Sequence, residues 1–144
     1  MHGRSSNLRK GRTSIVGHYY HIVFSTHHRQ AIFSDFSLAR IVVRELRKSD
    51  EVGVSETMAF VAMPDHIHWL LRLNRGSLSQ CIQRVKANVS RQIGQQVWNK
   101  GFYDHGIRKD ENLKNVGRYI VANPLRSGLV KNVGDYSHWD AAWI

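Results

Sequence analysis

The stretch SETMAFVAMPDHIHWLLRL, residues 55–73, decides the fold because it predicts a β-hairpin. Both halves are rich in apolar residues, and we expect strands over Ser55–Met63 and His66–Leu73. Pro64 and Asp65 stand between them, and this pair is typical of a tight turn. Side chains alternate across a strand, and one face of the second strand is wholly apolar: Ile67, Trp69, Leu71 and Leu73.

Elements on both sides of the hairpin extend the pattern. A first strand is expected within residues 18–33 and a fourth within residues 97–107. Two helices should lie between the strands, the first capped by Ser34 or Asp35 and the second by Ser77, because such side chains accept hydrogen bonds from the first helical turn. Their apolar residues recur at helical spacing: Phe36, Ala39, Val43 and Leu46 in the first, and Leu78, Cys81, Ile82, Val85, Val89 and Ile93 in the second. A third helix, capped by Asp110, carries Leu113, Val116 and Ile120.

The order β-α-β-β-α-β followed by an extra helix predicts an α+β fold of the ferredoxin-like kind. Two helices then cover one face of an antiparallel sheet, and we expect the other face to be free to carry a site. A chain of 144 residues suits one domain. We expect a basic arm over residues 1–14 and a single domain over residues 15–144.

Charge and composition limit the classes of partner that the protein could bind. Lys and Arg outnumber Asp and Glu by 21 to 11, and a field of this sign attracts polyanions such as nucleic acid, although a merely solubilising surface is the alternative. No apolar run approaches the roughly 18 residues needed to cross a bilayer, and the N-terminus lacks the apolar stretch of a secretory signal. The single cysteine, Cys81, excludes an intrachain disulfide. We therefore expect a cytoplasmic protein with no membrane partner.

Two histidines interrupt the apolar pattern of the second hairpin strand. His66 and His68 should point to the same side, about 6.6 Å apart along the backbone, where the sheet is expected to be uncovered. Two imidazole nitrogens can hold one divalent ion and leave other positions open for substrate oxygens. The alternative is a solvated pair of histidines without a ligand, since His-x-His alone is a weak signal.

A tyrosine on the third helix is a candidate nucleophile. Tyr119 lies one step, about 100°, around the helix from the buried stripe at Ile120. An ordinary tyrosine pKa of about 10 leaves a deficit of roughly 4 kcal/mol at pH 7. A metal ion or a nearby cation such as Arg118 would have to supply much of it. The alternative is a half-buried helix tyrosine with no role in chemistry.

Asn123 has two interpretations. It lies four residues after Tyr119 and would share its face if the helix runs that far. However, a residue before proline is pushed out of the α region, and Asn followed by Pro124 is a good cap and first position of a new helix that would end near Gly128. A metal ligand and a helix cap both remain open.

Taken together, these residues resemble the single-tyrosine HUH transposases and, within that group, the REP-associated tyrosine transposases. The likeness runs through most of the chain, and its order and spacing are more specific than any one segment. The matching segments are 8–12 (LRKGR), 20–26 (YHIVFST), 63–68 (MPDHIH), 101–105 (GFYDH) and 119–130 (YIVANPLRSGLV).

The resemblance implies an endonuclease and strand transferase dependent on Mg²⁺ or Mn²⁺. By position, His66 and His68 would bind the metal, and Tyr119, on a C-terminal catalytic helix, would form a 5′-phosphotyrosine bond and release a 3′-hydroxyl. Insertion-sequence relatives carry a third metal ligand one helical turn after the tyrosine, which is Asn123 here. Many relatives have glutamine at this position, and asparagine is shorter.

The same resemblance implies a DNA partner, single-stranded or folded into a hairpin, and a location at the nucleoid. The REP-associated branch recognises a hairpin flanked by a short tetranucleotide. Insertion-sequence relatives pair, whereas REP-associated ones more often act alone, so monomer and homodimer both remain open. The expected DNA-contacting residues are Arg9, Lys10 and Arg12 of the arm, Lys86 and Arg91 of the second helix, and Arg118.

Two other functions fit parts of the pattern. In a metal-dependent nuclease, water rather than Tyr119 would attack the phosphate. A non-catalytic module would bind nucleic acid, as ferredoxin-like sheets often bind RNA on paired aromatic motifs, but such motifs are not evident here. His105 would be either an extra polar group of the site or, as we prefer, a rim histidine hydrogen-bonded to Asp104.

Overall fold

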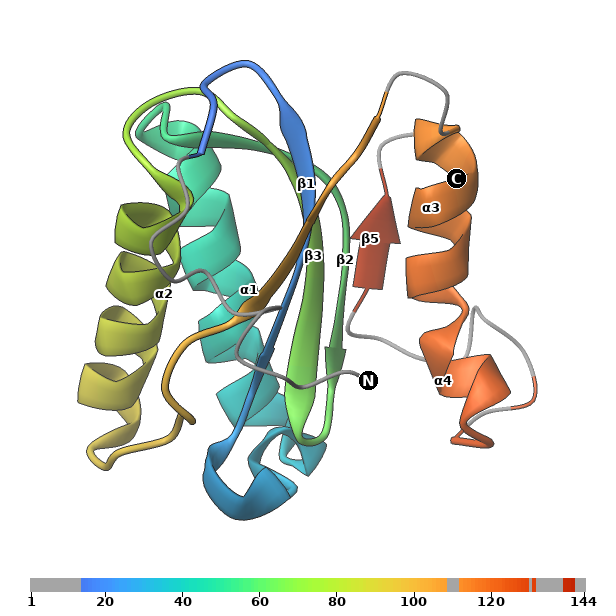
Figure 1. Ribbon diagram of the computed structural model, residues 1–144. Helices are drawn as coiled ribbons and strands as arrows, with labels where there is room; N and C mark the ends of the chain where they lie inside the picture. The colour runs from blue at the N-terminus through green and yellow to red at the C-terminus, as the bar shows by residue number, and fades with distance from the viewer. Residues whose placement is uncertain (1–13, 109–111, 130, 132–138, 142–144) are drawn as a thin grey trace.

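The computed structural model describes residues 14–108, 112–129, 131 and 139–141, which form an antiparallel sheet with helices on both faces (Figure 1). Helices α1 (Phe36–Glu51) and α2 (Leu78–Ile93) cover one face, and they alternate with the first four strands as predicted. The α+β, ferredoxin-like prediction is therefore confirmed. In the order β4-β1-β3-β2-β5, the strands are Tyr103–Gly106, Tyr19–Ser25, His66–Leu73, Ser55–Met63 and Trp139–Ala141.

The central hairpin has the predicted bounds, but the first and fourth predicted strands are shorter than expected. β1 stops at Ser25, and two short 3-10 turns follow, η2 (His27–Arg29) and η3 (Ile32–Ser34). The predicted strand over residues 97–107 is reduced to β4, because Gly101 takes a φ of +73° and breaks the extended chain. Before that break, Trp98 makes only an isolated bridge to Thr26.

Both covering helices begin where their caps predict. Asp35, not Ser34, caps α1 and accepts hydrogen bonds from the amides of Ser37 and Leu38. Ser77 caps α2 and forms a reciprocal pair with Gln80. The predicted apolar face of α2 is confirmed, whereas that of α1 is rotated. Its buried residues are Ala39, Val42, Glu45, Leu46 and Ser49, and Phe36 is exposed.

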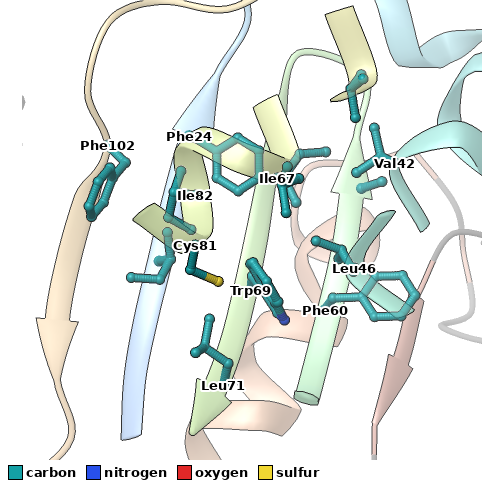
Figure 2. Close-up of a cluster of buried hydrophobic side chains, with 14 of the residues drawn as sticks. Phe24, Val42, Leu46, Phe60, Ile67, Trp69, Leu71, Cys81, Ile82 and Phe102 are labelled. Carbon is teal, nitrogen blue, oxygen red and sulfur yellow. The ribbon is translucent and has the colours of Figure 1, made fainter. Parts of the chain in front are cut away.

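The main core lies between these helices and the sheet, as the alternation of β3 predicts (Figure 2). Trp69 is fully buried between strands and helices, and its indole nitrogen donates to the hydroxyl of Thr57 at 2.9 Å. This bond satisfies the polar end of an otherwise apolar side chain. Burial of one β3 face fixes which residues must point the other way, because a shift of one residue would reverse every side chain.

The prediction that the second face is free is wrong for the part of the sheet around β2. Helix α3 (Leu113–Val121) packs there, and the chain then turns into the short helix α4 (Asn123–Arg126) (Figure 1). The apolar side of α3 is predicted correctly, but the described cap is Asn112, and Asp110 lies outside the described residues. A second core unites Ala59, Val61, Met63, Leu70, Ile120 and Val121. The uncovered half of this face carries the polar residues considered below.

The predicted arm lies almost wholly outside the described residues. Only its last residue, Ser14, is placed, and its hydroxyl accepts a hydrogen bond from the amide of Leu78 at 2.9 Å. The boundary at residue 14 stays a prediction. Among the described helices, none has the length and apolar content to cross a membrane.

Candidate active site

Four histidines lie on the half of the sheet that α3 leaves uncovered. His66 and His68 share one face of β3, as predicted, and their ring centroids are 5.0 Å apart. His21 of β1 lies on the same face, and its Nε2 is 2.9 Å from Nδ1 of His68. His105 of β4 is directly opposite His21 in the strand register. The strand order therefore assembles a histidine cluster from three neighbouring strands.

The electrostatics of the cluster keep its central members neutral. Burial, together with the neighbouring His21, His66 and Arg126, lowers the pKa of His68 to about 2. Burial and the nearby His105 lower the pKa of His21 to about 4. Both rings are therefore uncharged near neutral pH and keep a nitrogen lone pair, which is the form that binds a metal.

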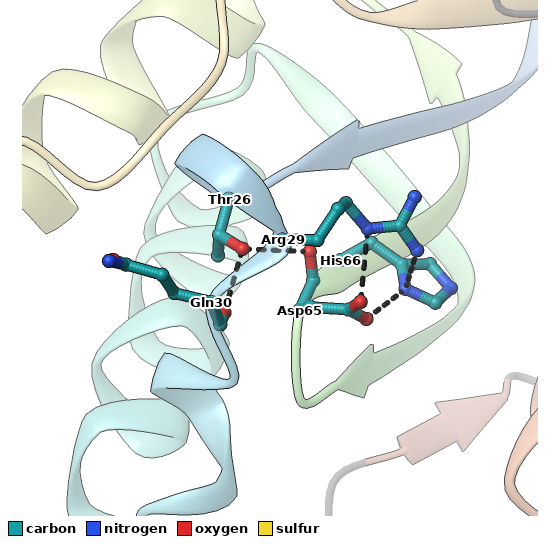
Figure 3. A network of polar contacts seen from close by, with 5 residues as sticks. All are labelled: Thr26, Arg29, Gln30, Asp65 and His66. Carbon is teal, nitrogen blue, oxygen red and sulfur yellow. Dashed lines mark hydrogen bonds and ion pairs between the residues drawn. The ribbon is translucent and has the colours of Figure 1, made fainter.

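His66 is oriented by a carboxylate and an arginine (Figure 3). Its Nδ1 lies 2.7 Å from Oδ1 of Asp65, and Oδ2 of Asp65 accepts from Nε of Arg29 at 3.0 Å. Burial alone would raise the pKa of Asp65, but the hydrogen bonds from His66 and Arg29 outweigh it and lower that pKa. The ionised carboxylate can only accept, so Nδ1 of His66 carries the proton in this contact, and Nε2 is the nitrogen left for a ligand.

A strained turn brings Arg29 to this position. His28 and Arg29 have φ values of +55° and +53°, a region that side chains other than glycine rarely adopt. The turn is held by Thr26, which is fully buried and whose hydroxyl donates to the carbonyl of Gln30 at 2.7 Å (Figure 3). The amide of Thr26 also donates to the carbonyl of Asp65 at 2.9 Å. Strain of this kind persists only where surrounding contacts hold it, and it often marks functional sites.

The donor set fits a divalent metal ion at His66 and His68. Each ring has one nitrogen engaged with a second group, Asp65 or His21, which is the arrangement that orients metal-binding histidines. Imidazole ligands favour a transition ion such as Mn²⁺ over Mg²⁺, which prefers oxygen. Within the described residues, no group of three or more His, Cys, Asp or Glu is placed to hold a metal.

Tyr119 is accessible and lies under an arginine. Its side chain is 60% exposed on α3, while Ile120 and Val121 anchor that helix to the sheet. The guanidinium carbon of Arg126 is 3.5 Å from the centroid of the Tyr119 ring. The sequence favoured Arg118 as the nearby cation, but the described cation over the ring is Arg126 of α4.

Asn123 begins α4 rather than extending α3, which ends at Val121. Its Nδ2 donates to the carbonyl of Ile120 at 3.0 Å. This bond uses the amide nitrogen and not the carbonyl oxygen that would bind a metal. The role of Asn123 as third ligand therefore stays a prediction.

The expected DNA-contacting residues are dispersed. Arg9, Lys10 and Arg12 lie outside the described residues, and Arg118 and Arg91 are exposed on α3 and α2. Lys86 is largely engaged, because its ammonium donates to the carbonyls of Asn99 and Gly101, and burial lowers its pKa to about 8. Lys86 and Arg91 line a groove of about 740 Å³ between α2 and residues 95–102.

Four residues of the site were not singled out from the sequence. The alternation of β1 predicts the position of His21. Ile22 faces the core, so His21 and Val23 must lie on the opposite face of the strand. Asp65 was assigned only to the turn, although it directly precedes the histidine pair. Arg29 had no local signal, because a strained turn brings it to the site, and Arg126 lies beyond the end of α3.

Comparison with protein families finds one match that covers most of the chain. The model of the family described as "Transposase IS200 like" matches residues 14–123. Two curated relatives are also similar. A Haemophilus influenzae protein, provisionally named a REP-associated tyrosine transposase, is 31% identical over 58% of this chain and 57% of its own length. The REP-associated tyrosine transposase of Escherichia coli is 24% identical over 74% of this chain and 65% of its own.

The chain thus spans less than two thirds of the length of either relative. Among solved structures, a REP-associated tyrosine transposase bound to a REP hairpin superposes with a TM-score of 0.79. It is 22% identical, and the match covers 91% of this chain and 81% of that one. A Deinococcus radiodurans protein, provisionally described as a transposase, superposes with a TM-score of 0.55 at 21% identity, over 78% and 95% of the two chains. At these identities the likeness shows the fold.

Proposed function

The chain belongs to the IS200-like transposase family, and from that premise we propose that it cuts and rejoins DNA through a covalent bond to Tyr119. The observation that carries the proposal is the placement of an exposed tyrosine and a histidine pair on one face of the sheet. Helix α3 packs on Leu70, two residues along β3 from His68, and Arg126 over the tyrosine is close enough for its charge to act on His68.

The proposed reaction is a reversible exchange at phosphorus. The phenol oxygen of Tyr119 forms a bond to the phosphorus of a phosphodiester, and the bond to the 3′ oxygen breaks. The phenol proton passes to solvent, and the departing 3′ oxygen takes up a proton to become a hydroxyl. Attack by a 3′-hydroxyl on the phosphotyrosine reverses these steps and joins two strands. A phenol, with an ordinary pKa of about 10, is a better leaving group than an alcohol, so the link stays reactive.

The residues of the histidine cluster prepare this exchange. His66 and His68 would hold Mg²⁺ or Mn²⁺, with Asn123 as a possible third ligand. A divalent ion bound there supplies Lewis-acid polarisation of a phosphate oxygen. Asp65 orients His66 through its Nδ1, and burial keeps His68 uncharged, so His68 presents a lone pair without prior loss of a proton.

We propose single-stranded or hairpin DNA as the partner. Two relatives are named for REP sequences, and one solved neighbour is bound to a REP hairpin. The net charge of +10 favours a polyanion. On the described surface, Arg91 and Arg118 are exposed and available for phosphate contacts. The arm residues Arg9, Lys10 and Arg12 would add contacts, whereas Lys86 mainly tethers the loop after α2.

Hairpin oligonucleotides from the DNA flanking the native gene, labelled at either end, test the proposal. Incubation with Mn²⁺ and separation on a denaturing gel should transfer a 3′-end label to the protein band. A 5′-end label should appear on a shortened free strand with a 3′-hydroxyl. If both labels appear only on free fragments, water is the attacking group. If no strand is cut while binding persists, the chain is a binding module.

A further inference from the structure

Arg126 joins the two halves of the site. Its guanidinium lies over the ring of Tyr119, 3.5 Å from guanidinium carbon to ring centroid. Its charge also reaches the buried ring of His68 on β3. Arg126 is positioned by α4, whose backbone is fixed by Pro124 near its start and by the bond from the amide of Arg126 to the carbonyl of Ala122. One side chain therefore borders both the candidate nucleophile and the candidate metal ligands.

Among the described residues, no protein group occupies the hydrogen-bonding edge of the stacked guanidinium. Stacking uses the flat face of the group, and the five N–H donors point outward in its plane. Within the described residues, these donors make no hydrogen bond or ion pair with a protein acceptor. Arg29, the other arginine beside the cluster, is instead paired with Asp65. Within the described part of the chain, Arg126 thus presents an unpaired charged fork beside the ring of Tyr119.

We propose that Arg126 binds the phosphate that Tyr119 attacks. A planar guanidinium matches two phosphate oxygens in a bidentate contact, and the stack on Tyr119 holds that contact at a fixed place beside the attacking oxygen. Arg126 is then a catalytic residue that touches the reacting group. This inference rests on the proposed function, because it names the group that binds the substrate in that reaction.

The test compares DNA binding by protein variants and by modified strands under conditions in which no DNA is cut. The cleavage position is first mapped with the wild-type protein. Binding is then measured by fluorescence anisotropy in EDTA with Tyr119→Phe protein, which cannot form the covalent bond and keeps the ring. The two ligands are the mapped hairpin oligonucleotide and the same strand with a neutral methylphosphonate at the mapped position. Arg126→Gln is compared with Arg40→Gln, which removes an arginine that lies over Phe36 on α1, away from the site.

We expect Arg126→Gln to weaken binding of the normal strand about 10-fold or more, the usual range for losing a hydrogen-bonded charge pair. It should change binding of the methylphosphonate strand less than about 2-fold, because the charged partner is already absent. Arg126→Lys should restore part of the loss, and Arg40→Gln should change neither ligand. Equal weakening of both strands by Arg126→Gln, or no weakening of either, would overturn the inference while wild-type cleavage upholds the proposed function. Absence of wild-type cleavage would overturn both.

Discussion

Asp65→Asn should weaken metal binding without disturbing the fold. The carboxylate of Asp65 accepts from Nδ1 of His66 at 2.7 Å and from Nε of Arg29 at 3.0 Å. Asparagine keeps the shape and one acceptor oxygen, and the backbone carbonyl of residue 65 still binds Thr26. The substitution removes the negative charge that makes both bonds charge-assisted, and the amide nitrogen of asparagine cannot accept the second of the two hydrogen bonds.

The expected magnitude follows from the role of Asp65 behind a metal ligand. Loss of such a supporting group costs about 10- to 100-fold in metal affinity, or about 1.4 to 2.7 kcal/mol. Titration with Mn²⁺, followed by the electron paramagnetic resonance signal of the free ion, measures the dissociation constant directly. Thermal unfolding of the metal-free protein checks that the fold is retained.

Asp35→Asn is the matched control. Asp35 is also a carboxylate that accepts hydrogen bonds at a turn, but it caps α1, and asparagine is an equally good cap. This variant should bind Mn²⁺ like the wild type. Wild-type Mn²⁺ affinity in Asp65→Asn would refute the reasoning that His66 binds a metal with support from Asp65.

Further predictions concern the histidines and the arm. His66→Ala and His68→Ala should each abolish Mn²⁺-dependent cleavage and retain a cooperative melt; full activity in either, measured on a denaturing gel, would contradict the metal assignment. The native pKa values of His21 and His68 are lowered to about 4 and 2, whereas both return toward 6.5 in the unfolded chain. Below pH 6.5 the unfolded chain therefore binds more protons than the native one, and stability should fall. Between pH 7 and pH 5 the free energy of unfolding should fall by on the order of 2 kcal/mol for each histidine. Urea titrations should show that this free energy depends less steeply on pH in His68→Asn. Deletion of residues 1–12 removes four cations, including Arg4, and should weaken DNA binding and reduce its salt dependence; an unchanged affinity and slope would exclude the arm from binding.

The elements that depend on local signals were predictable from the sequence. The hairpin bounds followed from the Pro64–Asp65 turn, and the start of α2 followed from its Ser77 cap. Alternation along β3 also placed His66 and His68 on one face. These features depend on spacing within a few residues, and nearby side chains specify them.

The features that depend on tertiary packing were not predictable in the same way. The packing of α3 on the second face buries Leu70, which alternation alone would leave beside the histidines. The contact between Arg126 and Tyr119 depends on how α4 follows α3 after the break at Ala122. Arg29 reaches Asp65 only through two residues with positive φ, which sequence preference disfavours.

Covalent adduct formation by Tyr119→Phe tests the central claim most directly. The change removes one exposed oxygen and keeps the ring under Arg126, so metal and hairpin binding should persist. Tyr103→Phe is the control, because Tyr103 lies on the same sheet face, opposite Val23 in the register of β4 and β1. With a 3′-end-labelled hairpin and Mn²⁺, we predict a labelled protein band for the wild type and Tyr103→Phe, and none for Tyr119→Phe. A labelled band of wild-type intensity from Tyr119→Phe would contradict the account.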